Sequence, residues 1–148
     1  MSKTIDLPGV PNLKTPEAGY ACGGQPSPEQ LVQARQAGLE RIINLRPASE
    51  DAGYDEAAKA KELGLEYHVI GIASGADLNH DNVKKLDALL GSEPAKTTFI
   101  HCKSGNRVGA LMALRAAWLQ GKPAAEAIET GKAWGLTSME AGVQQLLG

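Results

Sequence analysis

Short apolar runs alternate with stretches of helical periodicity along most of this chain. Runs of apolar and β-branched residues predict buried strands at 41–45, 66–72 and 97–100, and 20–24 is typical of an edge strand that ends in a turn. Helical spacing or nearly continuous apolar positions predict helices at 28–37, 55–63, 81–90, 107–120, 124–134 and 138–147. Because strands and helices alternate, we expect the strands to pair in parallel through right-handed crossovers.

Individual helices carry further sequence signals. Ser27 is placed as an N-cap, Pro28 occupies the first helical position, and Gln30 completes a capping box. This helix is expected to stop at Gly38, because glycine readily ends a helix in a left-handed conformation. The 107–120 helix is apolar or small on nearly every face, which predicts a central and buried position.

These elements predict a single-domain α/β fold over residues 1–148, with an irregular segment at 1–18. The expected architecture is a three-layer sandwich, in which helices flank a mostly parallel central sheet of about four to five strands. In open sheets of this kind, ligands bind at the edge where the carboxyl ends of the strands gather. We therefore expect the loops after Leu45 and Ile72 to converge with the loop that contains Cys102.

Composition narrows the set of partners. The net charge of −2 and the isoelectric point near 5.9 provide no basic field, and no Lys/Arg run is present, so a nucleic-acid partner is disfavoured. Residues 1–11 lack the apolar core of a signal peptide, and no apolar stretch is long enough to span a bilayer. We expect a cytoplasmic protein without a membrane partner, or a periplasmic one if a signal peptide has been removed.

Cysteine and histidine usage limits the chemistry further. Two cysteines, Cys22 and Cys102, are too few for a disulfide framework. His68, His80 and His101 lack metal-ligand spacing, so we expect no metal ion and no cofactor. Cys22 is interpreted as a small residue at the end of the edge strand, and the alternative is a resolving thiol for Cys102.

The most informative stretch is 97–107, where a short β-favouring run delivers Cys102 into a loop that opens onto a helix. The first N–H groups of a helix lack intrahelical partners and the helix dipole adds partial positive charge, so both favour a thiolate or a bound anion. Gly105 allows the backbone of a tight turn, and the planar fork of Arg107 fits a tetrahedral oxyanion. We interpret Cys102 as a nucleophile within its own anion cradle; the alternative is a buried small residue at a strand end.

His101-Cys102, a Gly-containing loop and Arg107 together resemble the signature of cysteine-based protein phosphatases of the dual-specificity type. Two further stretches, at 23–27 and 42–47, together with 104–107 of this loop, are similar to the bacterial phosphatase-like family named after a beta-lactamase hydrolase-like protein. The resemblance implies a cysteine phosphatase-like fold, a Cys102 that forms a thiophosphate, and an Arg107 that binds phosphate. The implied function is hydrolysis of phosphate monoesters, so the expected partner is a small anionic or phosphorylated substrate.

One feature departs from the phosphatase signature, which has five residues between Cys and Arg. This chain has four, Lys103 to Asn106, a spacing shared with rhodanese-type sulfurtransferases that carry a persulfide on the Cys. A six-residue loop encloses less volume, so it suits a sulfane sulfur more readily than a phosphoryl group. A sulfurtransferase is therefore the alternative function, and a non-catalytic module that binds anions or phosphoproteins is a third hypothesis.

Phosphoryl transfer needs a general acid to protonate the leaving oxygen. Asp77 lies between a strand and the helix before the Cys102 strand, which matches by position the acid loop of the phosphatases that the chain resembles. The alternative for Asp77 is a solvated loop residue near a helix start. Asp51 is a reserve candidate, in an acidic cluster with Glu50 and Asp55 that is otherwise interpreted as solvated or helix-capping.

The loop itself is assigned to anion binding, through Lys103, Ser104, Gly105, Asn106 and Arg107. Lys103 is expected to bias entry toward anions, and Ser104 to donate its hydroxyl to the thiolate. His101 has two interpretations. It is either a residue that tunes Cys102 through hydrogen bonds or a core histidine satisfied by the backbone.

Overall fold

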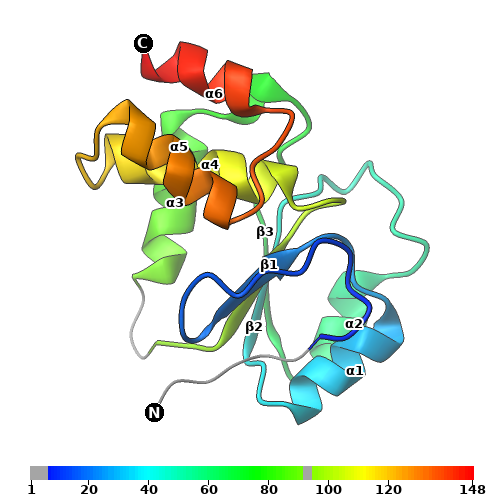
Figure 1. Ribbon diagram of the computed structural model, residues 1–148. Helices are drawn as coiled ribbons and strands as arrows, with labels where there is room; N and C mark the ends of the chain where they lie inside the picture. The colour runs from blue at the N-terminus through cyan, green and yellow to red at the C-terminus, as the bar shows by residue number, and fades with distance from the viewer. Residues whose placement is uncertain (1–6, 92–94) are drawn as a thin grey trace.

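The computed structural model describes residues 7–91 and 95–148, and it forms the predicted α/β sandwich. Four parallel strands make up its sheet in the order β1-β4-β2-β3, and each connection between successive strands passes through a helix (Figure 1). The elements in chain order are β1 (Tyr20–Gly23), α1 (Pro28–Gln36), β2 (Arg41–Asn44), α2 (Glu56–Glu62), β3 (Glu66–Val69), the 3₁₀ helix η1 (Gly75–Asp77), α3 (His80–Leu90), β4 (Thr98–His101), α4 (Asn106–Trp118), α5 (Ala124–Ala133) and α6 (Glu140–Leu147).

Helices cover both faces of the sheet (Figure 1). On one face, α1 and α2 lie over a buried cluster that includes Ile42 and Phe99, and on the other face α3, α4, α5 and α6 lie over a cluster that includes Ile43 and Ile100. Neighbouring residues of a strand point to opposite faces of the sheet. Because helices cover both faces, the two neighbours in β2 and the two in β4 are all buried. This two-sided burial explains why these strands are continuous apolar runs in the sequence.

Two helix starts have the expected caps. The Ser27 hydroxyl accepts from the Gln30 backbone N–H, and the Gln30 side chain accepts in return from the Ser27 N–H, which confirms the capping box. Asp55 caps α2 by accepting from the Ala58 N–H. Most predicted ends are correct within two residues, but β3 ends at Val69, three residues before the predicted end.

Residues 7–18 precede β1 as turns with one isolated bridge, in which Lys14 and Cys22 exchange two backbone hydrogen bonds of 2.9 Å. Leu7 and Val10 are buried in the cluster on the α1–α2 face. The segment therefore pairs with β1, which is an edge strand as predicted. Residues 1–6 of the segment predicted to be irregular lie outside the described ranges.

The helix α4 is central, as its sequence predicts, with eight buried residues. It contacts the α5 segment backbone to backbone: a Cβ atom on Gly109 would lie 2.1 Å from the Leu136 nitrogen, and a Cβ on Gly131 would lie 2.8 Å from the Gly109 oxygen. This contact fixes the amino end of α4. Although α4 is apolar, no helix among the described residues is long and apolar enough to cross a membrane.

The loops at the carboxyl edge of the sheet converge, as predicted. The Leu45 N–H donates to the His101 carbonyl over 2.8 Å, and the Ile72 N–H donates to the Leu45 carbonyl over 2.9 Å. The loop after β1 joins them, because Gly24 forms an isolated antiparallel bridge with Ser104. Three segments that are distant in sequence therefore surround the residues that follow β4.

Candidate active site

Cys102 lies between β4 and α4. Gly105 is the N-cap of α4 with φ of 96°, a left-handed conformation that strains any residue with a Cβ atom. Its backbone N–H donates to Cys102 Sγ over 3.0 Å. The Cys102 side chain is fully buried, so the thiol lies beneath the loop.

In the 102–107 loop the Lys103 and Ser104 carbonyl groups accept hydrogen bonds, whereas most of the N–H groups have no acceptor among the described residues. The Lys103 carbonyl accepts from the Gln25 N–H over 3.1 Å, and the Ser104 carbonyl accepts from Asn12 Nδ2 over 2.8 Å. Within the described parts of the chain, the N–H groups of Lys103, Ser104 and the first two residues of α4 donate to no backbone or side-chain acceptor. Such donors at a helix N-terminus form a cradle for an anion.

Arg107 is held in place by part of its guanidinium. Its Nη1 donates to Glu50 Oε2 and to the Ile72 carbonyl, each over 2.8 Å, and its Nη2 donates to Glu50 Oε1 over 3.0 Å. A guanidinium has five N–H donors, so among the described contacts the Nε–H and one Nη2–H remain. These two donors share one edge of the guanidinium plane and form a second fork that fits two oxygens of a tetrahedral anion.

Glu50 lies between two arginines, since its Oε1 also accepts from Arg46 Nε over 2.9 Å. The hydrogen bond from Arg107, assisted by that from Arg46 and opposed by burial, holds the pKa of Glu50 below its usual 4.5. The prediction that Glu50 is solvated or helix-capping is therefore wrong. Its carboxylate stays charged and fixes the position of Arg107.

His101 is fully buried with both ring nitrogens in hydrogen bonds. Its Nδ1 lies 3.1 Å from the Cys102 carbonyl oxygen, and its Nε2 lies 2.6 Å from Oε2 of the buried Glu56. A carbonyl oxygen only accepts, so Nδ1 carries a proton, and one further proton lies between Nε2 and Glu56. The ring is thereby fixed against the loop, while its effect on the thiol stays a prediction.

The predicted general acid, Asp77, lies in η1. Its Oδ2 accepts from the Ala73 N–H over 2.8 Å, so the carboxylate is turned onto its own loop. Asp51, the reserve candidate, is exposed and accepts from the Gly53 N–H over 2.7 Å. Within the described residues, neither carboxylate has a hydrogen bond to Cys102 or Arg107, so the identity of the acid stays a prediction.

The other predicted loop residues divide into two groups. Lys103 and Ser104 have exposed side chains. Asn106 instead holds the turn before α6: its Nδ2 donates to Ser138 Oγ over 2.8 Å, and its Oδ1 accepts from the Thr137 N–H over 2.9 Å. The backbone N–H of Asn106 is therefore the group that remains for an anion.

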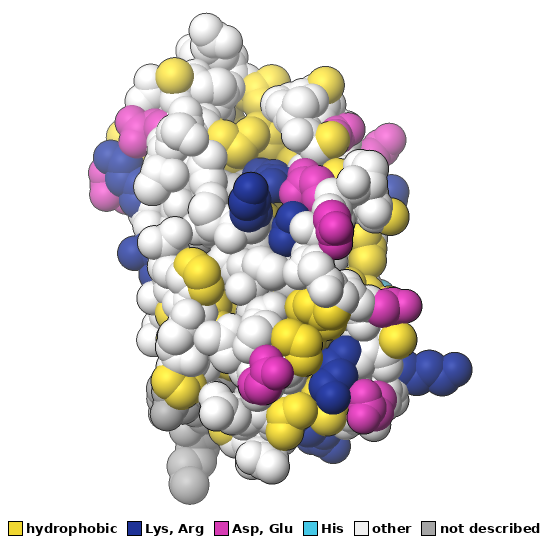
Figure 2. All heavy atoms as spheres, turned by 90° about the vertical axis from the view of Figure 1, so that its right-hand side faces the viewer, with side chains coloured by type: hydrophobic (Ala, Val, Ile, Leu, Met, Phe, Trp, Pro, Cys, Tyr) yellow, Lys and Arg dark blue, Asp and Glu magenta, His cyan; other side chains and the backbone are white. Residues whose placement is uncertain are grey.

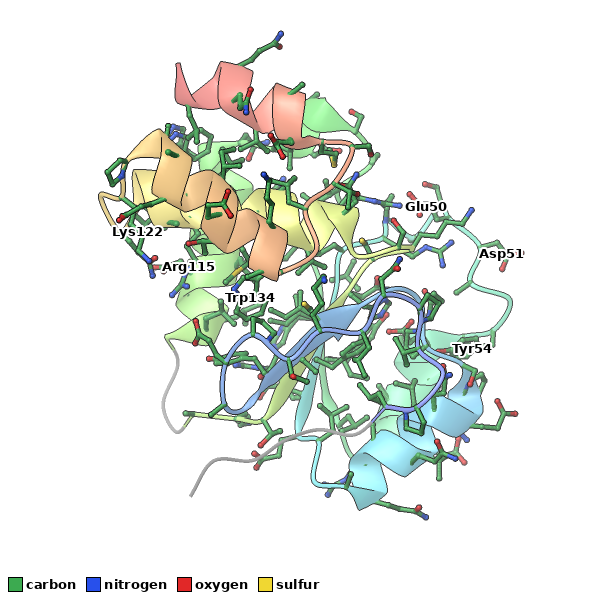
Figure 3. The ribbon with its side chains drawn as sticks, viewed as in Figure 1. Glu50, Asp51, Tyr54, Arg115, Lys122 and Trp134 are labelled. Atoms are coloured by element: carbon green, nitrogen blue, oxygen red, sulfur yellow. The ribbon has the colours of Figure 1, made fainter. Side chains whose placement is uncertain are left out.

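A pocket of about 410 Å³ has Arg46, Glu50, Tyr54 and Tyr67 in its lining and is connected to the Cys102 loop through the contact of Glu50 with Arg107. Figure 2 faces this side of the molecule and shows basic and acidic side chains next to one another near its middle. Figure 3 places Glu50, Asp51 and Tyr54 together on this side, away from Arg115. The polar residues of the 46–55 loop therefore border the arginine end of the Cys102 loop.

Cys22 is buried in the same core cluster as Cys102, and both cysteines are free. Its Sγ donates to the Trp134 carbonyl over 3.4 Å. Burial raises the pKa of the Cys22 thiol to about 12, against the opposing charge of Lys14. This environment favours the interpretation of Cys22 as a small strand residue over that of a resolving thiol.

The chain is 31% identical over 98 residues to a beta-lactamase hydrolase-like protein of Xylella fastidiosa. The match covers 64% of this chain and 22% of the relative, so the aligned region is about a fifth of the length of the curated relatives. No family model matches the chain. The sequence similarity therefore concerns one part of a longer relative.

Solved structures share the whole architecture. A candidate phosphatase (DUF442) from Shewanella putrefaciens has a TM-score of 0.72 at 22% identity, covering 95% of this chain and 93% of that chain. Tk-PTP in its active form has a TM-score of 0.69 at 18% identity, and the alignment covers 93% of this chain and 96% of that chain. The catalytic domain of the S. cerevisiae PP-IP phosphatase Siw14 also has a TM-score of 0.69 at 18% identity, and the alignment covers 96% of this chain and 87% of that chain. At these identities the likeness establishes the fold. The resemblance found in the sequence is thus confirmed: the chain has the fold of the protein tyrosine phosphatase-like cysteine phosphatases and is similar over 98 residues to the beta-lactamase hydrolase-like proteins.

Proposed function

We propose that this protein is a cysteine-dependent phosphatase that hydrolyses phosphate monoesters through a thiophosphate on Cys102. One observation carries the proposal. The thiol lies beneath a loop in which, among the described contacts, the N–H groups of Lys103, Ser104, Asn106 and Arg107 have no acceptor, next to an arginine that retains one fork. The fold shared with cysteine phosphatases supports the same reaction class.

The reaction has two steps. The Cys102 thiolate forms an S–P bond while the P–O bond to the leaving group breaks, and the leaving oxygen takes a proton from the acid, for which Asp77 is our candidate. Water then forms a new P–O bond while the S–P bond breaks, and its proton goes to the same carboxylate. Inorganic phosphate leaves and the thiolate is restored.

The Arg107 edge and the loop N–H groups bind the three non-bridging oxygens in this scheme. The positive charge of these donors lies where negative charge builds up on the phosphoryl oxygens during transfer, so the donors stabilise the transition state. Because the thiol is fully buried, substrate binding has to widen the loop before Sγ reaches phosphorus.

The test compares three proteins with p-nitrophenyl phosphate as the substrate. Wild type and Cys22→Ser are expected to release nitrophenolate, whereas Cys102→Ser is expected to release none and still bind inorganic phosphate in a calorimetric titration. Turnover by Cys102→Ser would show that the nucleophile is another group. Phosphate binding by wild type without any turnover would favour the non-catalytic module instead.

The four-residue spacing between Cys102 and Arg107 favours a second candidate, a sulfurtransferase. Here the thiolate attacks the outer sulfur of thiosulfate, sulfite leaves as the S–S bond breaks, and cyanide removes the persulfide sulfur as thiocyanate. Thiocyanate formation from thiosulfate and cyanide, absent in Cys102→Ser and unaccompanied by phosphatase activity in wild type, would replace our first proposal by this one.

A further inference from the structure

Arg46 is nine-tenths buried at the carboxyl edge of the sheet, where it makes three different contacts. Its Nε donates to Glu50 Oε1 over 2.9 Å, its Nη1 to Gln25 Oε1 over 2.8 Å, and its Nη2 to the Asp51 carbonyl over 3.1 Å. All three guanidinium nitrogens therefore have a protein acceptor. Unlike the Nε–H of Arg107, the Nε–H of Arg46 is already bonded, to Glu50, so the Nε edge of this guanidinium is held by the protein.

Gln25 continues the contacts in the other direction. Its Nε2 donates to Glu56 Oε1 over 2.6 Å, and Glu56 in turn holds the ring of His101, which contacts the Cys102 carbonyl. On the other side of Arg46, Glu50 contacts Arg107. One unbroken chain of hydrogen bonds therefore connects the two ends of the loop, in the order Cys102, His101, Glu56, Gln25, Arg46, Glu50, Arg107.

We propose, resting on the phosphatase function above, that Arg46 and Gln25 are positioning residues that set Arg107 relative to Cys102. Neither residue has a hydrogen bond to the thiol or the unused edge of Arg107 among the described contacts, so both act through Glu50, Glu56 and His101. A displacement of about 1 Å at a reacting group costs about 10²-fold in rate, which makes such bracing effective.

The charges explain why Arg46 is needed at this place. Glu50 carries one negative charge between two guanidinium groups, and it comes from the 46–55 loop, which lacks regular secondary structure. Without Arg46, the Glu50 side chain would keep, of its described contacts, the one to Arg107 and would move together with it. With Arg46 anchored on Gln25 and the Asp51 carbonyl, the carboxylate has a fixed position from which to hold Arg107.

The molecule contains a matched control. Arg115 donates through Nε to Asp87 Oδ1 over 2.9 Å, the same contact and distance as the one between Arg46 and Glu50. Figure 3 shows Arg115 on the side of the molecule opposite Glu50. Replacing Arg115 by Met therefore removes a similar ion pair without touching the chain of hydrogen bonds.

The experiment uses Arg46→Met, Gln25→Met, Arg46→Lys and the control Arg115→Met. Two quantities are measured: kcat and KM with p-nitrophenyl phosphate, and the ¹⁵N relaxation of the Arg107 Nε–H group. Arg46→Met is expected to lower kcat/KM about 10²-fold and to make the Nε–H mobile. Gln25→Met should have a smaller effect of the same kind. Arg46→Lys should lose less activity than Arg46→Met, because an ammonium can still pair with Glu50 although it does not also reach Gln25 and the Asp51 carbonyl.

The two readouts separate the possible failures. An Arg107 Nε–H that stays as ordered in Arg46→Met and Gln25→Met as in wild type overturns the positioning role, whatever the activity. Mobile Nε–H groups in these variants, combined with a wild type that hydrolyses no phosphate ester, support the positioning role and contradict the phosphatase function. Circular dichroism checks folding, and Gln25→Met, which keeps every charge, decides the matter if Arg46→Met does not fold.

Discussion

Two glutamates at opposite edges of the sheet form similar charge clusters. Glu50, at the carboxyl edge, pairs with Arg46 and Arg107, whereas Glu66, at the start of β3, pairs with Lys96, His68 and Arg41. Both are partly exposed, and both have a pKa held below the usual 4.5, chiefly by the hydrogen bond from Arg107 for Glu50 and from Lys96 for Glu66. By exposure and by the presence of several cations around one carboxylate, the two sites are similar.

The difference lies in the geometry of the cations. Lys96 and His68 meet Glu66 with an ammonium and one ring nitrogen, at the amino edge of the sheet. Arg41 is buried there, with its Nη1 at 3.7 Å from Glu66 Oε2 and its Nε bonded to Thr98 Oγ1. Arg107 meets Glu50 with one fork and, among the contacts of residues 7–91 and 95–148, retains another, one residue into α4 and beside N–H groups that have no acceptor. An ion pair thus contributes to a binding site when its cation has donors left over and the backbone next to it does too.

A third carboxylate sharpens this comparison and gives the largest expected effect. Asp77 has no cation partner among the described contacts, whereas Glu50 is kept charged by two arginines and is unsuited to give a proton. Asp77→Asn should slow hydrolysis of an alkyl phosphate by about 10²- to 10⁴-fold, the usual contribution of general acid catalysis. The loss on p-nitrophenyl phosphate should be much smaller, since its leaving oxygen scarcely needs a proton. Equal losses on both esters would exclude Asp77 as the acid.

Exchanging the cations tests the role of the fork directly. Arg107→Lys should lower kcat/KM by about 10²- to 10³-fold and raise the inhibition constant of inorganic phosphate, because an ammonium cannot hold Glu50 and an anion with separate forks. Lys96→Arg at the other cluster should leave both constants unchanged. If Arg107→Lys binds phosphate as well as wild type does, the unused edge of Arg107 does not face the anion.

Neutralising each carboxylate should separate the two clusters by activity. Glu50→Gln keeps the shape but weakens the hold on Arg107, so kcat/KM should fall about 10- to 10²-fold. Glu66→Gln should change kcat/KM less than twofold. Steady-state kinetics with p-nitrophenyl phosphate measures both, and a comparable loss in Glu66→Gln would mean that the clusters act through overall stability.

The smallest expected effect is on the pH dependence of stability, and the Glu50 and Glu66 clusters share it. A carboxylate with a lowered pKa stabilises the folded state above its usual pKa, and the stabilisation is lost as pH falls through the folded-state value. Wild type should therefore lose unfolding free energy as the pH falls below 4.5. Glu50→Gln and Glu66→Gln should each lose less, by under about 1 kcal/mol per pair. Urea denaturation from pH 3 to 6 measures this, and a steeper loss in either variant would contradict the assignment.

Local sequence signals were sufficient for the fold. The Ser27 cap, the two-sided apolar strands and the uniformly apolar 107–120 segment act through neighbours in sequence, so their periodicity predicts them. The placement of Cys102 between a strand and a helix N-terminus followed from the same signals. The convergence of the loops then followed from parallel topology.

The partners of the site residues were not predictable in this way. Glu50 meets Arg107 across 57 positions and Glu56 meets His101 across 45, and no spacing rule connects residues so far apart. Glu56 lies in the first turn of α2, where an acidic residue is adequately explained by the helix dipole alone. The sequence predicts that Asp77 lies in a loop, but it does not predict the 3₁₀ helix η1, in which the carboxylate accepts from the Ala73 N–H.

The backbone contact at Gly109 also determines where this architecture tolerates a change of length. A Cβ on Gly135 would lie 2.7 Å from the Gly105 oxygen, so the chain is tightly packed from Gly105 onward and α4 cannot slide along its axis. Lys103 and Ser104, by contrast, have side chains in solvent. Their backbones are not free, because the Lys103 and Ser104 carbonyls accept from Gln25 and Asn12. An extra residue at this point would leave the core unchanged but would displace these two hydrogen bonds, so the contacts of the loop backbone hold the four-residue spacing between cysteine and arginine.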